Sequence, residues 1–200
     1  MATEPALKTL AKKMKEYQIK HNTRDECFVN SFIFAQFARV LGFPKPRILP
    51  VYVIHEMVHE GEHIFVVAIH MCVHLGGNNS DEVADVSTQY ADLNNAEYFR
   101  TWAVLTKVYP SFTQHTHMEW LNLRLSNQIS SGKGALAKFM EYEGFAKKLN
   151  HFLDANPDID GIGMCPFGGE RIPYYDNMIE HIHPTMVSLL GLHPCIVRNT

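Results

Sequence analysis

Apolar residues recur every three or four positions along the first 21 residues, which predicts an amphipathic helix. We expect its apolar face to consist of Leu7, Leu10, Met14, Tyr17 and Ile19. The following stretch, CFVNSFIFAQFARVLG, is apolar almost throughout, so this second helix must be buried on most sides. Thr23 and Glu26 form a capping-box pattern before it, and Gly42 is the expected stop.

Beyond these helices, β-branched residues gather in three short runs that favour strands, at residues 48–54, 64–73 and 82–86. Turn residues separate the runs, first at Glu60-Gly61 and then at the sequence GGNN, residues 76–79. The pattern therefore predicts a three-stranded antiparallel meander.

The GGNN turn also predicts which residues of the meander lie opposite each other. If this loop closes the second hairpin, Leu75 pairs with Ser80, and the same register sets His70 directly across from Asp85. Residues opposite each other in an antiparallel pair share a face, so the imidazole and the carboxylate can form a hydrogen bond.

The spacing becomes helical again from about residue 94. It predicts four helices, over Ala96–Val108, Met118–Ile129, Gly134–Leu153 and Asn177–Leu190. Glycine and proline residues between 156 and 173 predict a connection before the last of them. We therefore expect a single α+β domain over residues 1–200, with a mainly helical extension over residues 94–200.

Composition narrows the function classes. Eighteen Lys and Arg against 21 Asp and Glu leave a net charge of −3, which argues against a nucleic-acid binder. No apolar run is long enough for a signal peptide or a membrane span, so we expect a cytoplasmic protein with no membrane partner. The four cysteines lie far apart with no CxxC pair, and we expect reduced thiols. Twelve histidines are present, five of them between residues 55 and 74. Because histidine is the side chain most often used as a metal ligand or general base near neutral pH, this cluster is where function is expected.

Cys27 is a candidate nucleophile. It is expected in the first turn of the buried helix, where unsatisfied N–H groups and the helix dipole favour a thiolate. Asp25 and Glu26 oppose that effect, so activation needs a basic partner. His70 can deprotonate the thiol while Asp85 orients the imidazole, which is the arrangement that nucleophilic acyl transfer requires.

Three segments carrying these residues resemble a known group of enzymes: ECFVNSFIFAQFARVLGFPKPRILPVYV, HMCVHLGG and EVADVST. Their order and spacing, over about residues 20–90, are similar to the catalytic core of the transglutaminase-like and papain-like cysteine enzymes. The resemblance implies a Cys-bearing helix packed on an antiparallel sheet, and a cysteine-dependent hydrolase or acyltransferase acting on protein or peptide amide bonds without a cofactor.

The sequence departs from that pattern at two points. Met71-Cys72 stands where an aromatic residue usually follows the histidine, and Ser87 replaces a proline. These departures leave His63 as an alternative base to His70. The oxyanion donors are expected to be the backbone N–H of Cys27 and a polar side chain from the preceding loop, with Asn22 as the candidate.

Residues 55–59 read HEMVH, an HExxH motif that offers a second hypothesis. On a helix, His55 and His59 would bind one Zn²⁺, with His63 as a third ligand, and Glu56 would act as the general base of a metalloprotease. The preceding residues favour a strand, however, in which His55 and His59 would lie about 13 Å apart. A third hypothesis is a protein-interaction module that has kept the scaffold and lost turnover.

Overall fold

The computed structural model describes residues 4–23, 26–43, 45–59, 62–75, 83–87, 98–105, 134–158 and 161–191. Within them, the elements in chain order are α1 (Glu4–His21), α2 (Cys27–Val40), β1 (Arg47–His59), β2 (Glu62–His74), β3 (Val83–Ala84), β4 (Tyr98–Leu105), α4 (Gly134–Ala155) and α5 (Arg171–Leu190). The strands form one antiparallel sheet in the order β3-β2-β1-β4. The expected α+β class is confirmed.

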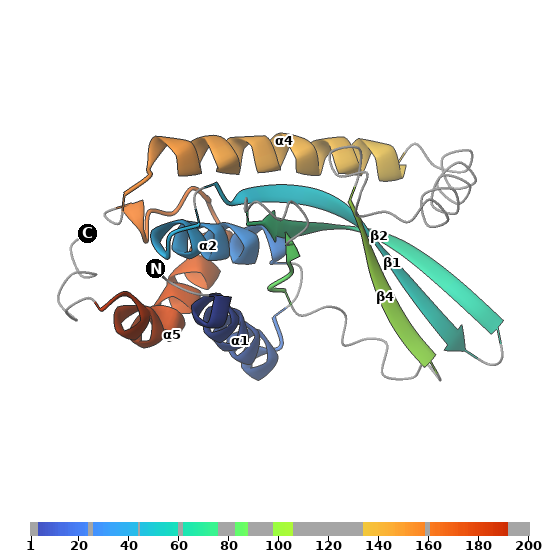
Figure 1. Ribbon diagram of the computed structural model, residues 1–200. Helices are drawn as coiled ribbons and strands as arrows, with labels where there is room; N and C mark the ends of the chain where they lie inside the picture. Colours follow the sequence, from blue (N-terminus) through green and yellow to red (C-terminus); the bar gives the residue numbers. More distant parts are fainter. Residues whose placement is uncertain are drawn as a thin grey trace.

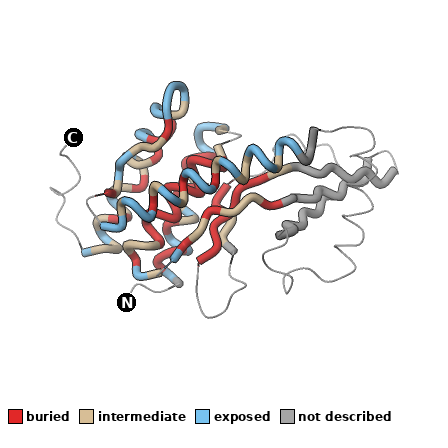
Figure 2. The backbone as a smooth tube through the Cα atoms, turned by 90° about the horizontal axis from the view of Figure 1, so that it is seen from above, coloured by how far each residue is buried: buried red, intermediate tan, exposed pale blue. Residues whose placement is uncertain are grey.

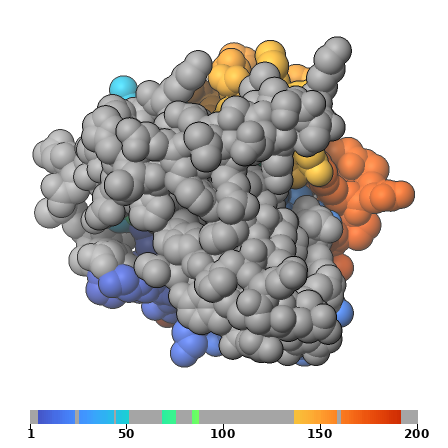
Figure 3. Space-filling view, turned by 90° about the vertical axis from the view of Figure 1, so that its right-hand side faces the viewer, coloured from blue at the N-terminus to red at the C-terminus, as the bar shows by residue number. Residues whose placement is uncertain are grey.

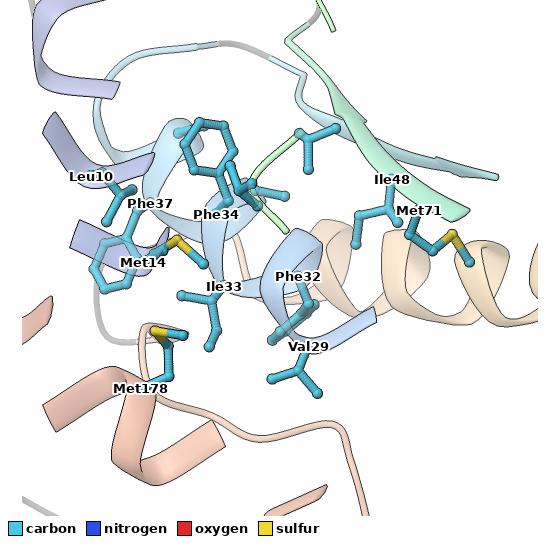
Figure 4. Packing of buried hydrophobic residues seen from close by; sticks show 14 of the residues in the cluster. Leu10, Met14, Val29, Phe32, Ile33, Phe34, Phe37, Ile48, Met71 and Met178 are labelled. Atoms are coloured by element: carbon cyan, nitrogen blue, oxygen red, sulfur yellow. The ribbon is translucent and has the colours of Figure 1, made fainter. Parts of the chain in front are cut away.

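Helix α2 is the centre of the molecule. It contacts α1, α4, α5 and both long strands, and Figure 1 shows it between α4 on one side and α1 and α5 on the other. All twelve residues from Cys27 to Ala38 are buried. Figure 2 shows the buried residues gathered in the interior of the described part of the molecule. In Figure 4, Phe32, Ile33 and Phe37 of α2 lie among residues of α1, α5 and the sheet. The apolar sequence of this helix therefore reflects burial on every side.

Helix α1 buries four of the five residues expected on its apolar face: Leu7, Leu10, Met14 and Tyr17. The fifth, Ile19, was predicted wrongly and is 72% exposed. It lies two residues beyond Tyr17, which is more than half a helical turn away from the buried stripe. Gln18 takes the buried position instead, four residues after Met14.

The predicted meander is present, and it has a fourth strand. β1 pairs with β2, and β2 pairs with β3. The helix predicted over Ala96–Val108 is wrong over residues 98–105, which form β4 along the free edge of β1. The sequence YFRTWAVL of β4 is rich in aromatic and β-branched residues, and pairing with a distant strand overrides its local helical spacing. The expected helical extension over residues 94–200 therefore begins with a strand.

The last two described helices pack on opposite parts of the molecule. α4 matches its predicted range closely and packs on β1 and β2, whereas α5 packs on α1. α5 begins at Arg171, six residues before its predicted start, because Pro173 falls in its first turn, where proline is tolerated. The helix predicted over Met118–Ile129 lies outside the described residues.

Described atoms of α1 and α4 border the face seen in Figure 3.

Among the described helices, none combines the length and apolar character needed to cross a membrane.

Candidate active site

Cys27 is the first residue of α2, as expected, but the predicted capping box does not form. Glu26 occupies the N-cap position and makes no side-chain cap hydrogen bond. Thr23 lies too far upstream to cap α2, because its backbone N–H still bonds to the carbonyl of Gln18 at the end of α1. Cys27 is buried, at 7% exposure. It therefore lies at a helix N-terminus whose backbone N–H groups receive no hydrogen bond from the side chain of the N-cap residue.

His70 and Asp85 meet, but their register differs from the prediction. β2 and β3 pair Val73 with Ala84, so the next position along the ladder sets Asp85 opposite Cys72 rather than His70. His70 is the diagonal neighbour of Asp85 on the same face, and its Nε2 lies 2.9 Å from Oδ1 of the carboxylate. The observed register is therefore shifted by two residues from the predicted one, and an even shift keeps every side chain on its face.

The buried imidazole of His70 has two partners. Burial alone would lower its pKa, but the hydrogen bonds to Asp85 and to the thiol of Cys27, with the charges of both groups, raise the pKa to about 9. Because Nε2 faces the carboxylate, Nδ1 is the ring nitrogen left for the thiol. His70 thus connects Cys27 and Asp85.

The carboxylate of Asp85 is held in its ionised form. Burial alone would raise its pKa, but hydrogen bonds from His70 and from the backbone N–H of Ser87 lower the pKa below its usual value. Oδ1 lies 3.1 Å from the Ser87 nitrogen. An acceptor fixed in this way can orient the imidazole.

A chain of buried polar groups, which sequence reasoning missed, supports this carboxylate. Tyr174 on α5 donates its hydroxyl proton to Oδ1 of Asn30 at 2.8 Å, and Nδ2 of Asn30 donates to Oγ of Ser87 at 3.3 Å. We call Tyr174, Asn30 and Ser87 the supporting chain. Its one signal in the sequence is Asn30, one of the few polar residues inside a mostly apolar helix, since such a residue needs buried partners.

Gln18 fixes the same loop from the other side. Its Nε2 donates to the carbonyl of Val86 at 2.8 Å and to the carbonyl of Met14 at 3.1 Å. It is 2% exposed. This bond joins α1 to the residue that follows Asp85, so the position of the carboxylate depends on contacts from two helices.

The alternative base, His63, lies at the far end of the long hairpin. It pairs with Val58 of β1, ten residues along β2 from Val73, where β3 pairs. Ten residues of strand span about 33 Å, so Asp85 cannot reach it. The geometry favours His70.

Asn22, the candidate oxyanion donor, has a structural role at the end of α1. It adopts a left-handed conformation with φ of 46°, and its side chain is exposed. Asparagine tolerates this conformation better than most residues, which suits it to end a helix. Within the described residues, no contact links Asn22 to Cys27.

The HExxH motif lies on a strand and not on the helix that a metalloprotease needs. His55 and His59 both belong to β1, where they pair with Val66 and Glu62 of β2. Four residues of strand separate them by about 13 Å, so they cannot bind one metal ion together. The structure therefore argues against the metalloprotease hypothesis at these residues.

The described cysteines, Cys27, Cys72 and Cys165, are all free thiols. Cys72 is 1% exposed, and burial raises the pKa of its thiol well above the usual value. Its Sγ, one ring nitrogen of His70 and one carboxylate oxygen of Asp85 all lie within 4.8 Å of one another. Cys165 lies elsewhere, on the connection before α5.

Comparison with known proteins gives no relative for this chain. No protein-family model, no curated protein and no solved structure matches it. The geometry of Cys27, His70 and Asp85 is therefore what indicates a function.

Proposed function

We propose that this chain is a cysteine-dependent hydrolase or acyltransferase that acts on protein or peptide amide bonds, with Cys27 as its nucleophile. One observation carries the proposal: the imidazole of His70 lies 2.9 Å from the carboxylate of Asp85 and also interacts with the thiol of Cys27, and both neighbours raise its pKa. A nucleophile, a base and a group that orients the base are what covalent acyl transfer requires. The resemblance of these segments to transglutaminase-like and papain-like enzymes supports the same conclusion.

The proposed reaction begins with the proton of the Cys27–His70 pair on the imidazole of His70, whose pKa is raised to about 9, and the Cys27 sulfur attacks the amide carbonyl. The C–N double-bond character is lost, and negative charge develops on the carbonyl oxygen. The backbone N–H of Cys27, at the N-terminus of α2, is suited to stabilise that charge. The imidazolium of His70 then protonates the leaving amine, and a thioester of Cys27 remains.

The second half of the reaction decides the product. His70 takes a proton from water or from an amine, and this nucleophile attacks the thioester and releases the Cys27 thiol. Water gives peptide hydrolysis or glutamine deamidation, and an amine gives a cross-link. All three outcomes pass through the same thioester, and we assign the chain to the class that contains them.

The test is the rate at which a fluorescent iodoacetamide labels Cys27 at about pH 6.5 in the presence of a chelator. We expect labelling at least about tenfold faster than that of free cysteine, because an imidazolium beside the sulfur stabilises the thiolate. Cys27→Ala should abolish the fast label, and His70→Gln should slow it at least about tenfold. Cys165→Ala, which removes a free thiol elsewhere, is the matched control and should leave the fast label intact.

Two results would contradict the proposal: labelling of Cys27 no faster than free cysteine, or labelling unaffected by His70→Gln. Either result would favour the interaction-module hypothesis. A second assay measures turnover directly, with glutamine-containing peptides, an added primary amine and mass spectrometry. It separates cleavage, deamidation and amine incorporation, and each product must disappear in Cys27→Ala.

A further inference from the structure

A second cysteine lies within the site but has no part in the proposed reaction. Cys72 is two residues after His70 on β2, so both residues are on the same face of the strand. The register of β2 and β3 sets Asp85 opposite Cys72. One thiol sulfur, one imidazole nitrogen and one carboxylate oxygen are thereby brought within 4.8 Å of one another in a buried position.

These three donors are the ligand types that zinc takes in proteins. A thiolate and an imidazole favour zinc over the harder calcium and magnesium ions, which prefer oxygen ligands. A tetrahedral zinc ion holds such atoms about 3.5 Å apart, so no pair of these groups needs to change its separation by more than about 1.3 Å. The supporting chain and Gln18 fix the loop of Asp85, which limits the cost of ordering this ligand.

We propose that Cys72, His70 and Asp85 form a zinc site, with its fourth coordination position open to water or to another ligand. On binding, the Cys72 thiol gives up its proton to solvent, and zinc replaces the proton that His70 and Asp85 share. The sequence motif that suggested zinc, at residues 55–59, is not involved. Cys72 is one of the residues that depart from the transglutaminase-like pattern, so the resemblance does not imply this ligand.

The regulatory consequence depends on the proposed function. Zinc takes the imidazole and the carboxylate that Cys27 needs, so an occupied site is an inactive one. In the metal-free site the imidazole of His70 stays 2.9 Å from the carboxylate of Asp85 and remains next to Cys27. Free zinc therefore acts as a reversible inhibitor of Cys27 chemistry.

The first experiment measures zinc binding without any turnover. The chelator-treated full chain is titrated with zinc chloride by calorimetry, and Co²⁺ serves as an optical probe because a thiolate ligand gives a charge-transfer band. We expect one zinc per chain, and a loss of more than about 100-fold in affinity in Cys72→Ala, since even residues that only orient a ligand are worth 10–100-fold. Cys165→Ala and His55→Ala are controls and should bind zinc as the wild type does.

Circular dichroism checks that each variant is folded, and Asp85→Asn, which keeps the side-chain shape, gives an independent loss of a ligand. The proposal is overturned if the wild type binds no zinc or if Cys72→Ala binds it unchanged. It is also overturned if affinity falls in Cys27→Ser and not in Cys72→Ala, because the thiol ligand would then be Cys27.

The second experiment separates this inference from the proposed function. The rate of Cys27 labelling is measured for each variant with and without zinc. At a free zinc concentration about ten times the Kd, wild-type labelling should fall roughly tenfold, by mass action, and labelling of Cys72→Ala should be insensitive to zinc. Fast labelling that zinc does not change overturns the inference and leaves the proposed function intact. Tight zinc binding without fast labelling supports the site and contradicts the proposed function.

Discussion

The Nε2 atom of His70 lies 2.9 Å from Oδ1 of Asp85 although the two residues are diagonal neighbours in the β2–β3 ladder rather than partners. Diagonal neighbours are farther apart than direct partners, and the long imidazole bridges the gap. The residue directly opposite the carboxylate is Cys72. The carboxylate of Asp85 therefore lies close to two side chains of β2. One is the imidazole that the proposed reaction uses, and the other is the thiol of Cys72, which the reaction does not use.

Asp85→Asn should lower the pKa of His70 from its value of about 9, because the carboxylate contributes both a hydrogen bond and a negative charge to the imidazolium. The titration can be followed by NMR of the histidine ring in metal-free buffer. Labelling of Cys27 at about pH 6.5 should fall at least about tenfold in the same variant. The control is Asp154→Asn, which removes a half-exposed carboxylate paired with Arg47 and should leave the His70 titration unchanged. An unchanged His70 pKa in Asp85→Asn would contradict the role given to this carboxylate.

The protonated imidazole should stabilise the fold in a defined pH range. The pKa of His70 is raised in the folded state from 6.5 to about 9, so the stabilisation is complete below about pH 6.5 and is lost as the pH rises through about 9. The difference in unfolding free energy between wild type and His70→Gln should therefore shrink from about pH 6 to pH 10, by on the order of 2–3 kcal/mol. Urea titrations in the presence of a chelator measure it, and a difference that grows with pH would contradict the prediction.

The packing of α2 makes a separate prediction. Phe32 is fully buried and makes edge-to-face contacts with Phe152 and Phe167, at centroid distances of 5.7 and 5.6 Å. Phe32→Ala should lower the unfolding free energy by about 3–5 kcal/mol, because it removes a buried ring and leaves a cavity. The control is Met140→Ala at a residue 63% exposed, which should change it by less than about 0.5 kcal/mol. Equal losses in the two variants, measured by urea titration, would contradict the central position of α2.

The sequence predicts those features of the site that follow from the spacing of apolar residues in α2 and from the alternation of side chains along the strands. Cys27 starts the buried helix because the apolar run starts there, and Gly42 ends it with a φ of 96° that glycine adopts freely. His70 and Asp85 share a face because strand side chains alternate with a period of two. The observed register of β2 and β3 differs from the predicted one by two residues, because composition indicates that a turn is present but does not determine its length. A shift of two residues leaves both side chains on the same face, so this part of the prediction holds.

The rest depends on contacts between distant segments, which local pattern does not contain. β4 becomes a strand by pairing with β1, far earlier in the chain, where Val53 lies opposite Ala103. Asn30 meets Tyr174 across 144 positions of sequence. The position of Cys72 beside His70 and Asp85 likewise emerges only when β3 is placed beside β2.

The supporting chain gives the last prediction, which separates stability from positioning. Tyr174→Phe removes the hydroxyl that Oδ1 of Asn30 accepts from, and a buried acceptor without its donor costs about 1–3 kcal/mol. Because Asn30 donates to Ser87, and the Ser87 N–H donates to Asp85, the carboxylate should also become less well held. Cys27 labelling should therefore slow, and the pKa of His70 should fall.

The matched control for this variant is the neighbouring tyrosine. The hydroxyl of Tyr175 is also engaged, donating to the carbonyl of Met164 at 3.1 Å and to Oε1 of Gln36 at 3.3 Å, but these partners do not lead to Asp85. Tyr175→Phe should thus lose a similar amount of unfolding free energy in urea titrations while its Cys27 labelling rate and His70 titration stay at wild-type values. If both variants changed labelling equally, the effect would come from general loosening of α5, and the positioning role of Tyr174 would be wrong.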